Sequence, residues 1–336
     1  MKENKLWFKL FSNCVIVKGE KESLIYDLGR NTNYPIPNFL IEVLKKLQSL
    51  PLSEYKKETK NETDVEVFVR QFVDEEIAFL TTTPELFPNL NLVWESPHSI
   101  TNAILEIKKN SKFKISNVFK QLEEIGCQAI QLRIKFTIKL ETITRYLAFL
   151  NNTRINCIDL LIPFDPKITL EELNNLIVKF PRIRAIILFS SKKNLVVSHD
   201  DILLNRRIIY LKKSLFKNNN EVINKNNFLY NIPAFTESLV YNLGLNRKVC
   251  ITSEGLIKNY LNHTAVFGNV ERDLIKSVIN QPEFQYKWNI SNDKIERCKD
   301  CQFRFSCESN SDIYSKNNKF YKKDYCSFDP HNNKWT

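Results

Sequence analysis

The stretch "INCIDLLIPFDPKITLEELNNLIVKFPRIRAIILFSS" (155–191) decides the fold, because two short apolar runs flank one amphipathic segment. The runs "INCIDLLIPF" and "IRAIILFSS" have the length and hydrophobicity of buried strands. Between them, "TLEELNNLIVKF" has apolar residues at helical spacing, and Thr169 with Glu172 three residues later predicts a capped helix start. A strand, a helix and a second strand in this order predict a right-handed βαβ unit with parallel strands.

The same alternation continues on both sides of this stretch. The segments "ITNAILEI", "CQAIQLRIKF" and "RIIYLKK" resemble strands, and "VFKQLEEIG" and "TITRYLAFLNN" resemble helices. Repeated strands and helices of this length predict an α/β fold with a parallel sheet or a partial barrel. We assign residues 98–235 to this βα-repeat domain.

Residues 1–85 have a different pattern. The segment "NCVIVKGEKESLIYDL" predicts two strands joined by a turn at Gly19, and "IPNFLIEVLKKLQSL" has apolar residues at helical spacing. A further helix then leads into a short strand in "DVEVFVRQFVDEEIAFLTTT". This order is the outline of a small winged-helix module. A proline-containing linker connects the module to the repeats, with prolines at Pro84, Pro88 and Pro97.

Residues 236–336 are poor in long periodic segments, and one helix is predicted in "RDLIKSVINQPEFQYKW". Most of the eight cysteines lie in this part of the chain. A stretch with so little regular structure needs an additional source of stability, which a metal site would supply. We therefore assign residues 236–336 to a metal-stabilised C-terminal domain.

The cysteines of "CKDCQFRFSC" (298–307) have the spacing C-x2-C-x5-C, and Cys326 follows. Thiolates in a short, turn-rich stretch suit either tetrahedral zinc or a four-iron cluster. A zinc ribbon repeats a second C-x2-C pair, which is missing here, so the spacing favours iron–sulfur, with zinc as the alternative. The predicted metal ligands are Cys298, Cys301, Cys307 and Cys326. The remaining cysteines are predicted to be buried structural thiols: Cys14, Cys127, Cys157 and Cys250.

Composition excludes several classes of function. The six glycines form neither G-x-G-x-x-G nor a P-loop, and the four histidines are scattered. The net charge of +11 comes without a run of interleaved aromatic and arginine residues, so nucleic-acid binding is not expected. No apolar run is long enough for a membrane span, and the charged N-terminus does not look like a secretion signal, so we expect a cytoplasmic protein. No residue can be named as a catalytic acid, base or nucleophile.

The cysteine stretch and several others resemble one known family. "CKDCQFRFSC…YCSFDPHNNKW" resembles the SPASM extension of radical SAM peptide maturases. The chain as a whole is similar to the SPASM-domain peptide maturases of grasp-with-spasm systems, which act beside an ATP-grasp ligase on ribosomally made, modified peptides (RiPPs). The similar stretches are "LFSNCVIVKG", "IYDLGRNTNYPIPN", "PELFPNLNLVW", "ITNAILEI", "FPRIRAIILFSS", "LNRKVCI" and "GLIKN".

The resemblance implies a role for each part of the chain. Residues 1–85 would be a RiPP recognition element that holds the leader segment of a precursor peptide as an added strand. Residues 98–235 would be a degenerate radical-SAM-like partial barrel. Residues 236–336 would be a SPASM-like domain, in which the four predicted ligands correspond to those of the second auxiliary 4Fe–4S cluster. Three cysteines that would serve the first auxiliary cluster are missing, because the corresponding positions hold Gly244, Tyr260 and Ser311. Only one cluster is therefore expected.

The resemblance also implies what chemistry to expect. A radical SAM enzyme needs C-x3-C-x2-C after the first barrel strand, and the sequence has no cysteine between Cys14 and Cys127. We therefore expect no SAM cleavage. The leading hypothesis is an accessory protein that binds a precursor peptide and supports the ATP-grasp ligase. Whether it is an enzyme stays open, since a redox-active maturase and a zinc-stabilised peptide-binding scaffold are the alternatives.

Overall fold

The computed structural model describes residues 5–59, 62–198, 206–214 and 223–336. The chain is a mixed α/β protein whose largest sheet has nine strands in the order β10-β11-β9-β8-β7-β6-β12-β13-β14. Strands β11, β9, β8, β7, β6 and β12 pair in parallel, and the strands at both edges pair antiparallel. The predicted parallel sheet is therefore confirmed.

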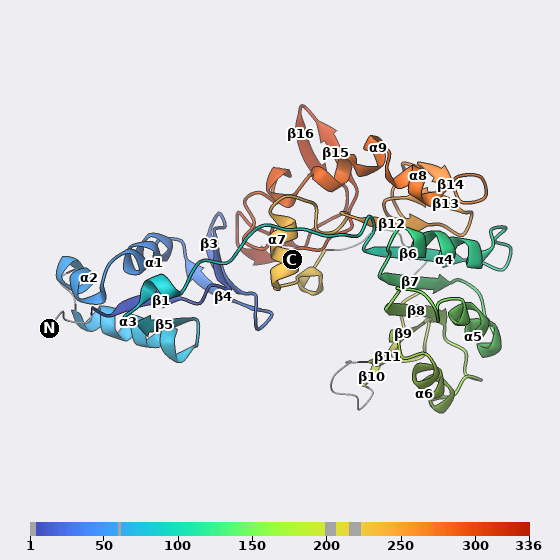
Figure 1. The fold of residues 1–336 in the computed structure, drawn as a ribbon, viewed down its shortest axis with the longest axis horizontal. Helices are drawn as coiled ribbons and strands as arrows, with labels where there is room; N and C mark the ends of the chain where they lie inside the picture. The colour runs from blue at the N-terminus through green and yellow to red at the C-terminus, as the bar shows by residue number, and fades with distance from the viewer. Residues whose placement is uncertain (1–4, 60–61, 199–205, 215–222) are drawn as a thin grey trace.

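The strand–helix alternation has the predicted order. Helices α4, α5 and α6 bury apolar side chains such as Phe119, Leu147 and Ile177 against one face of the sheet (Figure 1). Thr169 and Glu172 form the predicted capping box at the start of α6. The elements are β6 (Asn102–Ile107), α4 (Ile115–Glu124), β7 (Ala129–Ile134), α5 (Leu140–Ala148), β8 (Cys157–Pro163), α6 (Leu170–Lys179), β9 (Ile183–Phe189), β10 (Leu195–Ser198) and β11 (Arg207–Leu211).

The N-terminal module lies at the opposite end of the molecule from this sheet (Figure 1). The predicted hairpin is formed by β2 and β3, which continue into β4, and β1 pairs with β5. Helices α1, α2 and α3 pack on these strands around Phe8, Leu44 and Phe72. The bounds are β1 (Trp7–Leu10), β2 (Cys14–Val17), β3 (Glu22–Asp27), β4 (Thr32–Pro37), α1 (Leu40–Ser49), α2 (Leu52–Thr59), α3 (Glu62–Asp74) and β5 (Ala78–Thr81).

The C-terminal part has short elements, as its sequence predicts. The single helix predicted in "RDLIKSVINQPEFQYKW" is wrong, because the chain forms two short helices that are separated just before Pro282. A 3-10 turn follows the second helix directly. Proline cannot donate a backbone hydrogen bond and disfavours helical geometry in the preceding residue. The elements are α7 (Ile232–Ser238), β12 (Lys248–Ile251), β13 (Leu256–Lys258), β14 (Gly268–Asn269), α8 (Ile275–Ile279), α9 (Pro282–Gln285), η3 (Tyr286–Asn289), η4 (Asn292–Lys294), β15 (Ile313–Lys316), β16 (Lys319–Lys322), β17 (Phe328–Asp329) and β18 (Lys334–Trp335).

Two features connect these parts. Strand β12 pairs in parallel with β6, so the C-terminal part extends the sheet that the βα repeats begin. Short 3-10 turns lie in the connections, at η1 (Pro84–Leu86) and η2 (Lys225–Asn227).

Within the described ranges, no helix combines the length and hydrophobicity that crossing a bilayer requires.

Candidate metal centre

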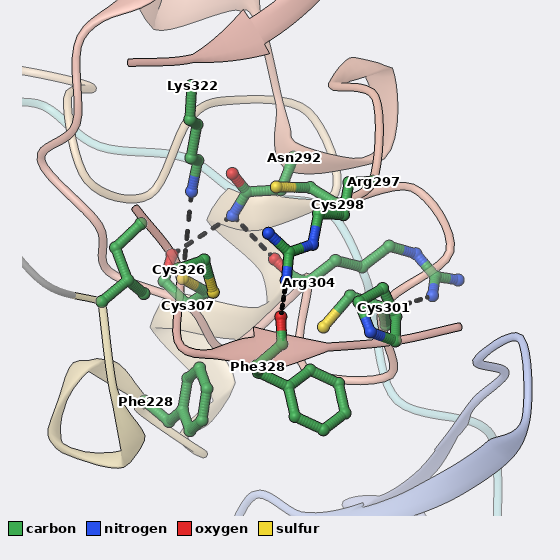
Figure 2. A pocket seen from close by; sticks show the side chains of 12 residues that line it. Phe228, Asn292, Arg297, Cys298, Cys301, Arg304, Cys307, Lys322, Cys326 and Phe328 are labelled. Carbon is green, nitrogen blue, oxygen red and sulfur yellow. Dashed lines mark hydrogen bonds between the residues drawn. The ribbon is translucent and has the colours of Figure 1, made fainter. Parts of the chain in front are cut away.

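The four predicted ligands line a single cavity. Cys298, Cys301, Cys307 and Cys326 line a small cavity of about 40 Å³ between the turn at 298–307 and the segment that ends in β17 (Figure 2). Apolar side chains from Phe228 and Phe328 form much of the remaining wall. The structure thus brings together residues that are up to 28 positions apart in the sequence (326 − 298).

Local hydrogen bonds shape the C-x2-C turn. The amide of Cys301 donates to the carbonyl of Cys298 at 3.0 Å, and the amide of Phe303 donates to the sulfur of Cys301 at 3.4 Å. Arg297, immediately before the turn, has a left-handed backbone with φ of 66°. Its guanidinium donates to the carbonyl of Phe328 at 2.6 Å. A strained residue held by a specific bond is typical of functional sites, and here it directs the chain into the turn.

A distant segment holds the other two cysteines in place. Cys307 forms an isolated β-bridge with Phe228, and Cys326 forms one with Ile223. The amide of Leu229 donates to the carbonyl of Ser306 at 2.8 Å, and the amide of Ile223 donates to the carbonyl of Tyr325 at 3.1 Å. Residues 223–229 therefore act as a brace between Cys307 and Cys326, and the cysteine spacing contains no sign of it.

Asn292 is a second residue that the sequence does not reveal. Its side-chain nitrogen donates to the carbonyl of Arg304 at 2.9 Å and to that of Cys307 at 3.2 Å (Figure 2). Because Asn292 is buried, these bonds fix the backbone between Cys301 and Cys307. No motif marks Asn292, since asparagine is abundant throughout the chain.

The cavity is surrounded by positive charge. The ammonium of Lys322 lies 3.9 Å from the sulfur of Cys307, and Arg297 and Arg304 also line the cavity. Burial acts to lower the pKa of Lys322, but the nearby cysteine sulfurs outweigh burial and the pKa is raised. Burial also raises the pKa of the Cys298 and Cys301 thiols. The cations therefore offset the electrostatic cost of burying deprotonated thiols in this cavity.

The donor set fits a group larger than one ion. Thiolates bind zinc at about 2.3 Å, which requires the sulfurs to converge closely. Among the described residues, no three histidine, cysteine or acidic side chains converge closely enough to hold one ion. The four sulfurs instead border a wider space with an apolar wall and nearby cations. These are properties that suit a four-iron cluster ligated by four thiolates.

The cysteine turn also touches the N-terminal module. The buried hydroxyl of Tyr26 donates to the carbonyl of Gln302 at 2.6 Å, and the amide of Glu20 donates to the carbonyl of Asp300 at 2.8 Å. The guanidinium of Arg304 donates to the carbonyl of Lys18 at 2.5 Å. The apolar cluster around Tyr26 includes Phe303, so the β2–β3 hairpin rests directly on the turn at 298–307, which carries three of the four candidate ligands.

Gly244, Tyr260 and Ser311, which stand where the resemblance implies cysteines, make other contacts in the structure. Gly244 lies so close to Ser309 that a Cβ would be 1.8 Å from its carbonyl oxygen. The hydroxyl of Ser311 accepts a bond from the amide of Asp324 at 2.8 Å. Tyr260 receives a bond from the Arg133 guanidinium at 3.4 Å. Each position thus has a structural role that needs no metal.

Three of the other four cysteines are buried as predicted, and Cys157 is not. Cys14, Cys127 and Cys250 are buried, and burial raises the pKa of each thiol to about 12. Cys157 is only half-buried, and burial raises its pKa as well. Because these thiols stay protonated near neutral pH, each of these cysteines is a poor nucleophile. They support strands and the entrance to β7 and lie outside the candidate centre.

Comparison with known proteins adds no assignment. No known family model matches the sequence, and no curated protein shows significant similarity to it. The candidate centre therefore has to be interpreted from its own geometry.

Proposed function

We propose that this protein assists the maturation of a ribosomally made peptide. In this role it binds an extended precursor segment, works beside an ATP-grasp ligase and carries one 4Fe–4S cluster on Cys298, Cys301, Cys307 and Cys326, without SAM cleavage. The observation that carries the proposal is the single cavity lined by all four thiols, which is wider than one ion needs. When bound, the cluster would stabilise the C-terminal part and could accept an electron.

The proposed cluster is tested by anaerobic purification followed by absorption spectroscopy and metal and sulfide analysis. We expect a broad band near ~400 nm and about four irons and four sulfides per chain. Cys301→Ala should lose this band, whereas Cys157→Ala, outside the cavity, should keep it. One zinc per chain without iron would establish the zinc-stabilised scaffold instead.

Peptide binding is supported by a groove in the N-terminal module. Helix α3 and strand β5 border an open groove of about 600 Å³, whose lining includes Val67, Arg70 and Leu80. Val67 is 63% exposed, which is unusual for a valine on a helix that packs against a sheet. Within the described residues β5 pairs only with β1, which leaves its other edge available for an added strand.

Another outer strand of the module, β4, is less suitable for strand addition. It is the outer strand of the β2–β3–β4 sheet and contains Pro35 and Pro37. Proline lacks an N–H group, and prolines on an edge strand prevent further strands from pairing there. We therefore place the precursor segment along β5, with apolar residues on Val67 and Leu80 and an acidic residue on Arg70.

A display selection with random 20-residue peptides against the full chain tests this placement. We expect enriched peptides with alternating apolar residues, whose affinity falls at least about tenfold in Val67→Glu. The matched control is Val178→Glu on α6, because Val178 is 65% exposed but lies outside the groove. Equal binding by the two variants would refute the placement.

The cations around the cavity favour a second candidate, electron transfer to or from the bound peptide. Lys322, Arg297 and Arg304 line the cavity and would stabilise the negative charge that a bound cluster gains on reduction. Peptides selected for binding, incubated with the anaerobic protein and dithionite, should then change mass with the wild-type chain and with Cys157→Ala, but not with Cys301→Ala. An unchanged peptide mass in every case would favour the accessory role.

A further inference from the structure

A polar pocket of about 260 Å³ lies apart from the metal centre and shares no lining residue with it. Three segments meet there: the end of the linker, the turn before β12, and the chain from α8 to η3. The lining of the pocket includes Asn246, Arg247, Gln285 and Trp288. The pocket plays no part in the cluster or in the α3–β5 groove.

Arg247 is a fixed cation in this pocket. Its backbone is left-handed, with φ of 49°, which is unfavourable for a residue with a long side chain. Its guanidinium lies over the ring of Trp94, 5.2 Å from the centroid, and donates to the carbonyl of His98. A strained backbone and a stacked guanidinium present the charge in one orientation, which lowers the entropic cost of binding an anion.

Trp288 provides a donor that needs a partner. Its side chain is 7% exposed, and its ring packs edge-on against Phe284 with centroids 5.6 Å apart. The indole Nε1 has no hydrogen-bond partner among the described residues. The atom is enclosed in the structure, so an acceptor from a ligand reaches it only when the side chains of the pocket wall move. A buried N–H without a partner is costly, so such an acceptor would be stabilised there.

The amide side chains supply acceptors. The nitrogen of Gln285 donates to the carbonyl of Ile279 at 2.9 Å, and the nitrogen of Asn246 donates to the carboxylate of Glu237 at 2.8 Å. With the nitrogens engaged in this way, the side-chain oxygens remain as acceptors for N–H groups of a ligand. The pocket therefore combines one cation, a neutral donor and amide oxygens.

We propose that this pocket binds an acidic residue of a polypeptide, with the side-chain carboxylate on Arg247 and Trp288 and backbone N–H groups on the amide oxygens. A monoanion matches the single guanidinium, whereas a phosphate dianion would face only one cation with the Glu237 carboxylate nearby. A peptide also supplies the neutral N–H donors that a simple carboxylic acid lacks.

The assignment of this pocket rests on the proposed function, because its natural ligand would be the precursor peptide that also binds the α3–β5 groove. The two can fail separately, because the pocket and the groove use different residues. Val67→Glu should weaken binding of the selected peptides in the groove at least about tenfold and leave binding in the pocket unchanged.

The probe is N-acetyl-L-glutamate N′-methylamide, and its binding to the full chain is measured by ligand-observed NMR. We expect a dissociation constant of about 1 mM, as suits a single residue with a few directional contacts. The uncharged glutamine analogue should bind at least about tenfold more weakly, and Arg247→Gln should weaken binding of the glutamate probe to a similar extent.

Trp288→Phe keeps the aromatic packing and removes only the N–H donor, so it tests the site even if Arg247→Gln is poorly folded. We expect about a fivefold loss of affinity in Trp288→Phe and no change in Val67→Glu. Equal binding of the glutamate and glutamine probes, no binding at ~50 mM, or unchanged affinity in Trp288→Phe would overturn the proposal.

Discussion

Lys322 shows how much one residue can contribute to the candidate centre. It comes from the β15–β16 hairpin and places its ammonium 3.9 Å from the sulfur of Cys307. Four thiolates and a cluster carry net negative charge, and reduction adds one more electron. A nearby cation stabilises the reduced form more than the oxidised form, so Lys322 should raise the reduction potential.

Replacing Lys322 by methionine should therefore make the bound cluster harder to reduce. We expect the midpoint potential to fall on the order of 50–150 mV, as measured by anaerobic titration followed by electron paramagnetic resonance. Lys323→Met is the matched control, because Lys323 is the exposed neighbour outside the cavity. Equal potentials in both variants would mean that Lys322 is screened from the cluster.

Glu237 is a residue whose ionisation opposes folding. Burial raises its pKa from 4.5 to about 6, although the bond from Asn246 acts in the opposite direction. Between pH 4.5 and 6 the folded protein retains a proton that the unfolded chain has lost, so the free energy of unfolding falls as the pH rises. Above about pH 6 the full cost is present.

Glu237→Gln should remove this cost and keep the acceptor for Asn246. We expect the free energy of unfolding to increase by about 2 kcal/mol at pH 7.5 and to change little at pH 4, as measured by urea denaturation. Glu171→Gln, on the exposed face of α6, should have no such pH-dependent effect. The same gain at both pH values would show that the effect is not electrostatic.

At the scale of elements, α6 has the best-defined start among the helices on the main sheet. The amide of Glu172 donates to the Thr169 hydroxyl at 3.2 Å, and the amide of Thr169 donates to the Glu172 carboxylate at 2.8 Å. Helices α4 and α5 have no side-chain bond at their N-caps. Local capping side chains therefore stabilise the start of α6, and the starts of α4 and α5 lack such bonds.

Thr169→Ala should reduce the free energy of unfolding by about 1 kcal/mol, because it leaves an N-terminal N–H of the helix without its partner. Denaturant-induced unfolding followed by circular dichroism measures the loss. Lys139→Ala at the N-cap of α5 is the control and should have little effect, since the Lys139 side chain makes no capping bond. A similar loss in both variants would remove the special role of the capping box.

The elements that could be predicted are those whose stability is encoded locally. Buried parallel strands such as β8 and β9 are continuous apolar runs, and the helices between them have a clear apolar face. Strand β4 was missed because Pro35 and Pro37 lower its strand propensity, yet β3 still pairs with it. The helix across Pro282 was wrongly predicted because periodicity alone ignores the missing proline donor.

The candidate centre was predictable only in part, for a related reason. The spacing of Cys298, Cys301 and Cys307 is local, and it identified the site. The brace at residues 223–229 and the cation of Lys322 reach the site through tertiary contacts, which leave no pattern in the sequence. The same holds for Arg247 and Trp288, which come from separate segments.

At the scale of the whole molecule, the cysteine turn couples the C-terminal part to the N-terminal module. The bonds from Glu20 to Asp300 and from Tyr26 to Gln302 cross the junction within the turn between Cys298 and Cys307. A bound metal group would hold this turn in one conformation and so stabilise the surface on which the hairpin rests.

Loss of the metal group should therefore loosen the junction. In Cys301→Ser we expect backbone hydrogen exchange at Glu20 to become about tenfold faster or more, because its acceptor belongs to the destabilised turn. Exchange within β8 should stay unchanged, and Cys157→Ser serves as the control variant. Unchanged exchange at Glu20 would mean that the junction is stable without the metal group.

The long-range pairing of the chain has a consequence for its synthesis on the ribosome. Strand β6 emerges early but waits for β12, 146 residues later (248 − 102), before its second edge is paired. The β2–β3 hairpin waits even longer, because its partner turn begins at Cys298. Nascent chains therefore expose Leu24, Tyr26 and one edge of the main sheet until translation is nearly complete. Exposed apolar surface and an unpaired strand edge favour aggregation, so we expect this chain to benefit from chaperones during its translation.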